Sequence, residues 1–67
     1  MIPTRTQQAA ILAAMRRDGI SQNAVARMAG VGVASVNRIV KCKPPRHCKR
    51  VPALWRVLDA LGLEDLK

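Results

Sequence analysis

The sequence predicts an all-α protein, a small domain of four to five helices. Hydrophobic residues recur at intervals of three and four along most of the chain, as they do on the inner face of a helix. No segment shows the period-two alternation that marks a half-buried strand. A chain of 67 residues is long enough for one domain, so residues 1–67 are expected to fold as a single unit. The core must be built from aliphatic side chains, because there is no Phe or Tyr and a single Trp.

The first helix is expected to run from about residue 5 to Arg17. Thr4 can cap its start, and Gln7 stands three residues later, as a capping box requires. Gly19 supplies the left-handed conformation that commonly follows a helix. The apolar face of this helix is expected to carry Ile11, Leu12 and Met15.

Two shorter helices are expected next, on either side of a tight turn "GVG". Ser21 can cap the first of them, which runs from Gln22 to about Ala29. Gly30 closes that helix at a position where a positive φ favours glycine. The second is expected from Val33 to Val40 or Lys41. The apolar residues predicted to be buried between the two helices are Val25, Ala26, Ala29, Val31, Val36 and Ile39.

A fourth helix is expected after a segment that cannot be helical. Pro44 and Pro45 exclude helix there, whereas Pro52 is well suited to the first position of a new helix. This helix is expected to end at Leu61, before Gly62, and "LEDLK" adds one short turn. Its predicted apolar face consists of Leu54, Val57, Leu58 and Leu61.

Charge is the strongest compositional signal. Twelve Lys and Arg face four Asp and Glu, which gives a formal net charge of +8. Residues 16–50 hold nine of the twelve basic residues and one acid, Asp18. The excess therefore favours a polyanion as partner, on one strongly positive side of the fold.

Several other classes of function are disfavoured. No apolar run approaches the roughly 18–20 residues of a membrane span, and the N-terminus does not resemble a signal peptide, so a cytoplasmic protein is expected. With four acids, no paired carboxylates, no nucleophile–His–acid set and no phosphate loop, neither an enzyme nor a cofactor is expected. Charge alone leaves RNA as a possible partner, but RNA-binding domains commonly stack bases on aromatic residues and this chain offers only Trp55.

The segment "QNAVARMAGVGVASVNRIVK", residues 22–41, has the layout of a helix-turn-helix. It resembles that motif in the phage repressor and Cro-like family. The family pattern has Gln opening the first helix, Ala four residues on, Gly four further, and Val or Ile six after the Gly. Those places are filled here by Gln22, Ala26, Gly30 and Val36. Gly32 departs from the family, which often has Ser there as helix cap.

The resemblance to this lambda-repressor-like fold covers nearly the whole chain. "VARMAGVGVASVNRIV" is also similar to the start of lactose-repressor-type proteins, but here a full helix precedes the motif. The family implies that the second helix of the motif reads base edges in the major groove. Val33 and Ala34 would then meet thymine methyls, Asn37 would pair with adenine and Arg38 with guanine. The alternatives are a solvated helix face for Asn37 and Arg38, and a Val33 folded back onto the turn.

The resemblance implies a sequence-specific double-stranded DNA-binding regulator, most simply a small phage- or prophage-type repressor. It would occupy a palindromic operator as a homodimer, in the nucleoid of a bacterial or phage-infected cell. The alternative is an antitoxin-like module that covers a partner protein and binds its own operon. The dimer interface is predicted on the last helix and C-terminus, at Trp55, Leu58, Leu61 and Leu63, although Trp55 is equally compatible with the core.

The segment "KCKPPRHCKR", residues 41–50, allows three interpretations. A zinc site is disfavoured because Cys42 and Cys48 are separated by five residues and only His47 accompanies them. A disulfide is disfavoured because cytosolic cysteines normally stay reduced. The preferred interpretation is a basic, proline-stiffened clamp on the DNA backbone, with His47 a weaker candidate and the cysteines incidental. The predicted phosphate-binding residues are Gln22, Ser35, Lys41, Lys43, Arg46, Lys49 and Arg50.

Overall fold

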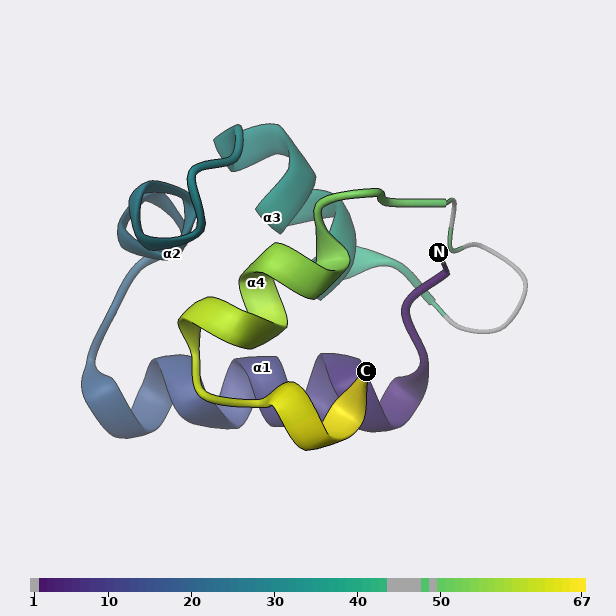
Figure 1. The fold of residues 1–67 in the computed structure, drawn as a ribbon, viewed down its shortest axis with the longest axis horizontal. Coiled ribbons are helices and arrows are strands. Elements are labelled where there is room, and N and C mark those ends of the chain that lie inside the picture. The colour runs from purple at the N-terminus through teal and green to yellow at the C-terminus, as the bar shows by residue number, and fades with distance from the viewer. Residues whose placement is uncertain (1, 44–47, 49) are drawn as a thin grey trace.

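The computed structural model describes residues 2–43, 48 and 50–67 (Figure 1). The prediction of an all-α protein is confirmed, since these residues contain helices and no strand. The radius of gyration is 10.4 Å, close to the roughly 11 Å of a compact chain of this length. The elements are α1 (Arg5–Asp18), α2 (Gln22–Ala29), α3 (Val33–Lys41), α4 (Leu54–Ala60) and the 3₁₀ turn η1 (Glu64–Leu66).

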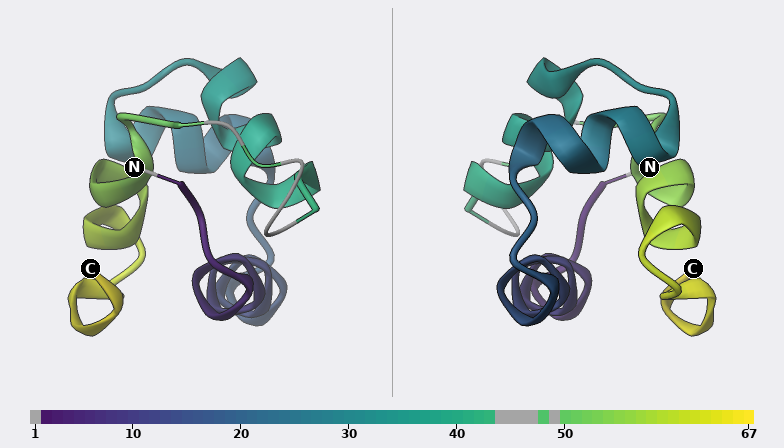
Figure 2. Two further views of the ribbon diagram at one scale, coloured as in Figure 1. Left: turned by 90° about the vertical axis from the view of Figure 1, so that its right-hand side faces the viewer. Right: turned by 90° about the vertical axis from the view of Figure 1, so that its left-hand side faces the viewer.

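The helices surround one core. Figure 1 shows α1 along one edge of the molecule and α2 with α3 at the opposite edge, with α4 between them. In Figure 2, α3 and α4 stand on opposite sides of the molecule. None of the helices in the described part of the chain is long and apolar enough to span a lipid bilayer.

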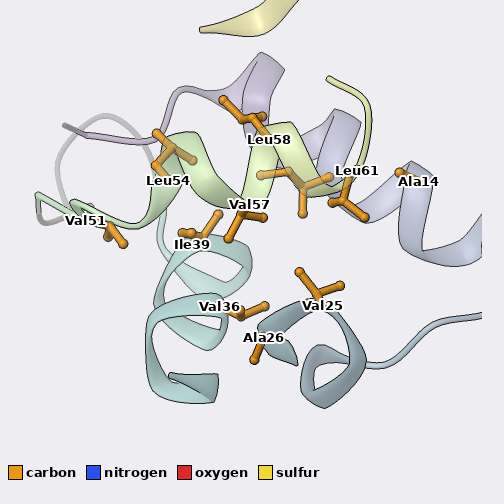
Figure 3. Close-up of a cluster of buried hydrophobic side chains, with 11 residues drawn as sticks. Ala14, Val25, Ala26, Val36, Ile39, Val51, Leu54, Val57, Leu58 and Leu61 are labelled. Carbon is orange, nitrogen blue, oxygen red and sulfur yellow. The ribbon is translucent and has the colours of Figure 1, made fainter. Parts of the chain in front are cut away.

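The predicted apolar faces meet in the centre. Side chains from α2, α3 and α4 converge on one cluster (Figure 3). On α1 the buried hydrophobic residues are Ile11 and Ala14, whereas Met15 only packs against the edge of the cluster and Leu12 is half-buried. The fully buried hydrophobic side chains of the cluster are Ile11, Val25, Val36, Ile39, Leu54, Val57 and Leu58.

The predicted helix starts and stops of the first half of the chain are confirmed. The Thr4 hydroxyl accepts from the Gln7 backbone N–H at 3.1 Å, and the Gln7 side chain accepts from the Thr4 N–H at 2.9 Å. Ser21 Oγ accepts from the Ala24 N–H at 3.2 Å. Gly30 has φ +68°, where a side chain would strain the backbone. These local signals place α2 and α3 at their predicted bounds.

The fourth helix starts later than predicted. Pro52 and Ala53 lie in a turn, and α4 begins at Leu54. The backbone N–H of Val57 donates to the Ala53 carbonyl at 3.1 Å, so Ala53 is the N-cap and Pro52 precedes it. The helix ends at Ala60, and the predicted short turn "LEDLK" is present as η1.

Gln7 joins the two ends of the chain. Besides its part in the capping box, its Nε2 donates to the Leu66 carbonyl of η1 at 2.7 Å. The side chain is buried, and both its Oε1 and its Nε2 are hydrogen-bonded. A buried amide that lost these partners would destabilise the fold by about 1–3 kcal/mol. Gln7 thereby anchors the C-terminal turn to the start of α1.

Candidate nucleic-acid interface

Helix α3 has one buried and one exposed face. Val36 and Ile39 are fully buried in the core. A helix turns by 3.6 residues, so positions 33, 34, 37, 38 and 41 share the opposite side. The side chains found exposed on that outer face are Val33, Ala34, Asn37, Arg38 and Lys41. The four predicted base-reading residues are therefore brought together on one surface.

The turn between α2 and α3 fixes the direction of α3. The backbone N–H of Gly30 donates to the last carbonyls of α2, and the Val31 N–H donates to the Ala26 carbonyl at 3.0 Å. Ala26 is buried, and its methyl side chain is small enough to let the two helices pack closely. Gly32 is the N-cap of α3 and provides no side-chain cap. The start of α3 is thus held by backbone hydrogen bonds and by packing on α2.

The other end of α3 is held by Gln8 of α1. Its Nε2 lies 2.9 Å from the Val40 carbonyl and 2.7 Å from the Cys42 carbonyl, with Ile39 O at 3.1 Å. The last carbonyls of a helix have no partner within the helix, so this amide satisfies groups that would otherwise need water. Gln8 was not among the residues predicted from the sequence. The available signal was its place on the inward stripe of α1, three residues before Ile11.

The predicted phosphate-binding residues fall into three groups. Lys41 at the end of α3, Lys43 just after it and Arg50 in the segment before α4 are exposed. Gln22 at the start of α2 and Ser35 in the first turn of α3 are half-buried. The remaining candidates lie outside the described residues, and these are Arg46, His47 and Lys49.

Two ion pairs between described residues lie away from the outer face of α3. Arg17 Nε is 3.1 Å from Asp18 Oδ1, and this hydrogen bond and the aspartate charge raise the pKa of Arg17. Lys67 Nζ pairs with Asp59 Oδ1. Two of the four acidic residues are therefore engaged near the ends of α1 and α4, so their charge is not directed at Arg38 or Lys41.

Cys42 and Cys48 form a disulfide bond, with Cα atoms 4.9 Å apart. This corrects the interpretation of the cysteines as incidental. Cys42 is the residue after α3, and Cys48 is 8% exposed. A sulfur in a disulfide is not the thiolate that zinc requires. The described residues contain no cluster of three potential metal ligands.

The predicted dimer residues divide between core and surface. Leu58 is fully buried and Leu61 is 7% exposed, so both belong to the monomer core and neither is available to a second copy. Their prediction as interface residues is wrong because the stripe that they form faces α1, α2 and α3. Leu63 is half-buried. Trp55 is 48% exposed, which excludes its assignment to the core, and Lys67 Nζ lies 5.8 Å from its ring centroid.

No protein-family model, curated protein or solved structure matches this chain. The functional conclusion therefore depends on the residues themselves. The geometry combines three features: an exposed helix face with both polar and apolar side chains, a cationic residue at the end of that helix, and attachment of both helix ends to the rest of the fold by hydrogen bonds.

Proposed function

We propose that this protein is a sequence-specific regulator that binds double-stranded DNA through the outer face of α3. The observation that carries the proposal is the exposure of Val33, Ala34, Asn37 and Arg38 on one side of a helix whose other side is fully buried. A helix about 10–12 Å wide with its side chains fits a major groove about 12 Å wide. The arrangement of α2, turn and α3 supports a helix-turn-helix of the phage repressor and Cro-like type.

The chemistry of the outer face suits base recognition. The Asn37 amide offers one donor and one acceptor, which match N7 and N6 of adenine. The Arg38 guanidinium offers two parallel donors for O6 and N7 of guanine. Val33 is 45% exposed, so its methyl groups are available to a thymine methyl rather than folded back onto the turn.

The exposed cations supply affinity that does not depend on sequence. Lys41 ends α3, Lys43 follows it by two residues, and Arg50 lies in the segment before α4; all three are exposed. A net charge of +8 adds long-range attraction to a polyanion. Regulation would follow from occupancy of an operator, as in small phage-type repressors. Two copies would read half-sites about 34 Å apart, with Trp55 the exposed candidate for their contact.

Selection of binding sites from random duplexes tests this function. The purified protein is expected to enrich a short motif that contains adenine and guanine at the positions facing Asn37 and Arg38, arranged as an inverted repeat if two copies bind. Specific and random duplexes are expected to differ by at least ~10³-fold in affinity. Retention of DNA with no enriched sequence would contradict specific recognition. Capture of one stoichiometric host protein in that case would favour the antitoxin-like alternative.

The salt dependence of binding tests the phosphate contacts. Replacing Lys43 by Ala is expected to weaken specific and random duplexes alike, and to reduce the slope of log K against log salt by about 0.9. Arg56→Ala is the matched control, since it removes one exposed charge from α4, away from the outer face of α3. Equal slopes for the two variants would contradict a phosphate contact at Lys43 and would show that the salt dependence reflects net charge alone.

A further inference from the structure

We propose that Cys42 and Cys48 are a reversible thiol–disulfide site that sets the affinity of the protein for DNA. The inference rests on the proposed function and adds a regulatory modification to it. The bond is placed where it joins the end of α3 to the core. Cys42 directly follows α3, and its backbone N–H donates to the Arg38 carbonyl at 3.2 Å. Cys48 is buried three residues before Val51, which belongs to the core cluster.

The bond sharply limits the separation of the two cysteines. Cys48 lies six positions after Cys42, and an extended chain over six steps can reach roughly 20 Å. With the bond closed, their Cα atoms are 4.9 Å apart. Lys41 and Lys43 flank Cys42, and Arg50 lies two residues after Cys48. Lys43 and Arg50 are each within two residues of a bonded cysteine. The closed bond therefore limits how far these two cations can lie from each other and from the end of α3.

The outer face of α3 does not depend on this bond. Gln8 holds the carbonyls of Val40 and Cys42 by hydrogen bonds that reduction leaves in place. Cys42 Sγ also lies 3.5 Å from the Ile39 carbonyl, so the thiol formed on reduction has an acceptor within reach. Opening the bond should thus remove the link that holds Lys43 and Arg50 near each other, so that these two cations would have to be ordered again on binding. Lys41 stays on α3, and base recognition persists.

Opening the disulfide by thiol–disulfide exchange needs a dithiol reductant, such as dithiothreitol. Its thiolate attacks the Sγ of Cys42, the more exposed of the two residues, and the Cys42–Cys48 bond breaks as Cys48 leaves as a thiolate and takes up a proton. The second thiolate of the reductant then displaces Cys42 from the mixed disulfide. The protein gains two electrons and two protons, and the reductant becomes a disulfide.

Binding by the oxidised and reduced protein tests the proposal. Thiol titration of the purified full chain should give no free thiol before dithiothreitol and two after it. Reduction is expected to raise Kd on the order of tenfold for both a selected duplex and a random one. The upper limit is roughly 50-fold, the factor that corresponds to the entropy of closing a seven-residue loop. The ratio of the two Kd values is expected to stay constant.

The variant Cys42→Ser with Cys48→Ser is the control for direct effects of the reductant. It should bind like the reduced protein, with or without dithiothreitol. Equal Kd values for oxidised and reduced protein would overturn the switch but leave the proposed function intact. Absence of DNA binding in both forms would overturn both. Loss of the helical circular dichroism signal on reduction would also overturn the proposal, because affinity would then fall through unfolding of the domain.

Discussion

Replacement of both Asn37 and Arg38 by alanine is expected to reduce strongly the preference of the protein for its selected site. Each bidentate contact to a base contributes about 1–3 kcal/mol of discrimination, so the pair accounts for about 2–6 kcal/mol. That energy corresponds to a loss of roughly 30-fold to 10⁴-fold in specific affinity. Both side chains are exposed, and alanine is the better helix former, so the fold is expected to be unaffected.

The measurement is quantitative footprinting or titration on the selected duplex and on a random duplex of equal length. Binding to the selected duplex should fall toward the level of the random one. The double variant Asn23→Ala with Arg27→Ala is the matched control, because it removes the same two residue types from exposed positions of α2. It is expected to retain the preference. An unchanged footprint for the Asn37 and Arg38 variant would refute base reading by α3.

The two side chains should also be separable by base. Arg38→Ala is expected to relax the requirement for guanine at one position of the site and leave the adenine position intact, whereas Asn37→Ala should do the reverse. A repeated selection with each variant therefore assigns each side chain to its base. This pattern would distinguish direct contact from a general weakening of the helix.

The parts of the fold that were predictable from the sequence depend on local chemistry. Ser21 and Gly30 define α2 because a hydroxyl cap and a left-handed glycine act within one turn of chain. The outer face of α3 followed from the periodicity of Val36 and Ile39, which fixes the opposite side. The location of the candidate site, though not its function, could thus be derived from the spacing of apolar residues alone.

The parts that were missed depend on contacts between distant segments. Gln8 caps α3 from 31 or more residues away, so its place on the inward stripe of α1 indicates burial but does not identify the carbonyls that it binds. The Cys42–Cys48 bond depends on the path of the chain between α3 and Val51, whereas the prediction of reduced cysteines relied on compartment alone. On α4, the spacing of apolar residues identified an apolar stripe but not which of its residues are buried by other helices. Trp55 and Leu58 were therefore grouped together, although one is exposed and the other is buried.

Leu58 provides the sharpest test of that division. Its side chain is fully buried in the cluster formed by α1, α2, α3 and α4. Truncation of such a leucine to alanine typically destabilises a domain by about 2.7–5 kcal/mol, because the apolar contact is lost and a cavity remains. A core of this size seldom supplies more than about 3–5 kcal/mol in total. Leu58→Ala is therefore expected to be largely unfolded at 37 °C, as measured by thermal and urea denaturation followed by circular dichroism.

Trp55→Ala is the control on the same helix. Trp55 is half-exposed and its ring lies against Lys67, so its loss is expected to lower the free energy of unfolding by about 1 kcal/mol or less. A dimer role for Leu58 predicts a different result. The Leu58→Ala protein would then keep the wild-type monomer stability, and only self-association would weaken, with a dependence of the midpoint on protein concentration. Full burial of Leu58 inside one chain predicts instead that its loss unfolds the monomer at every concentration.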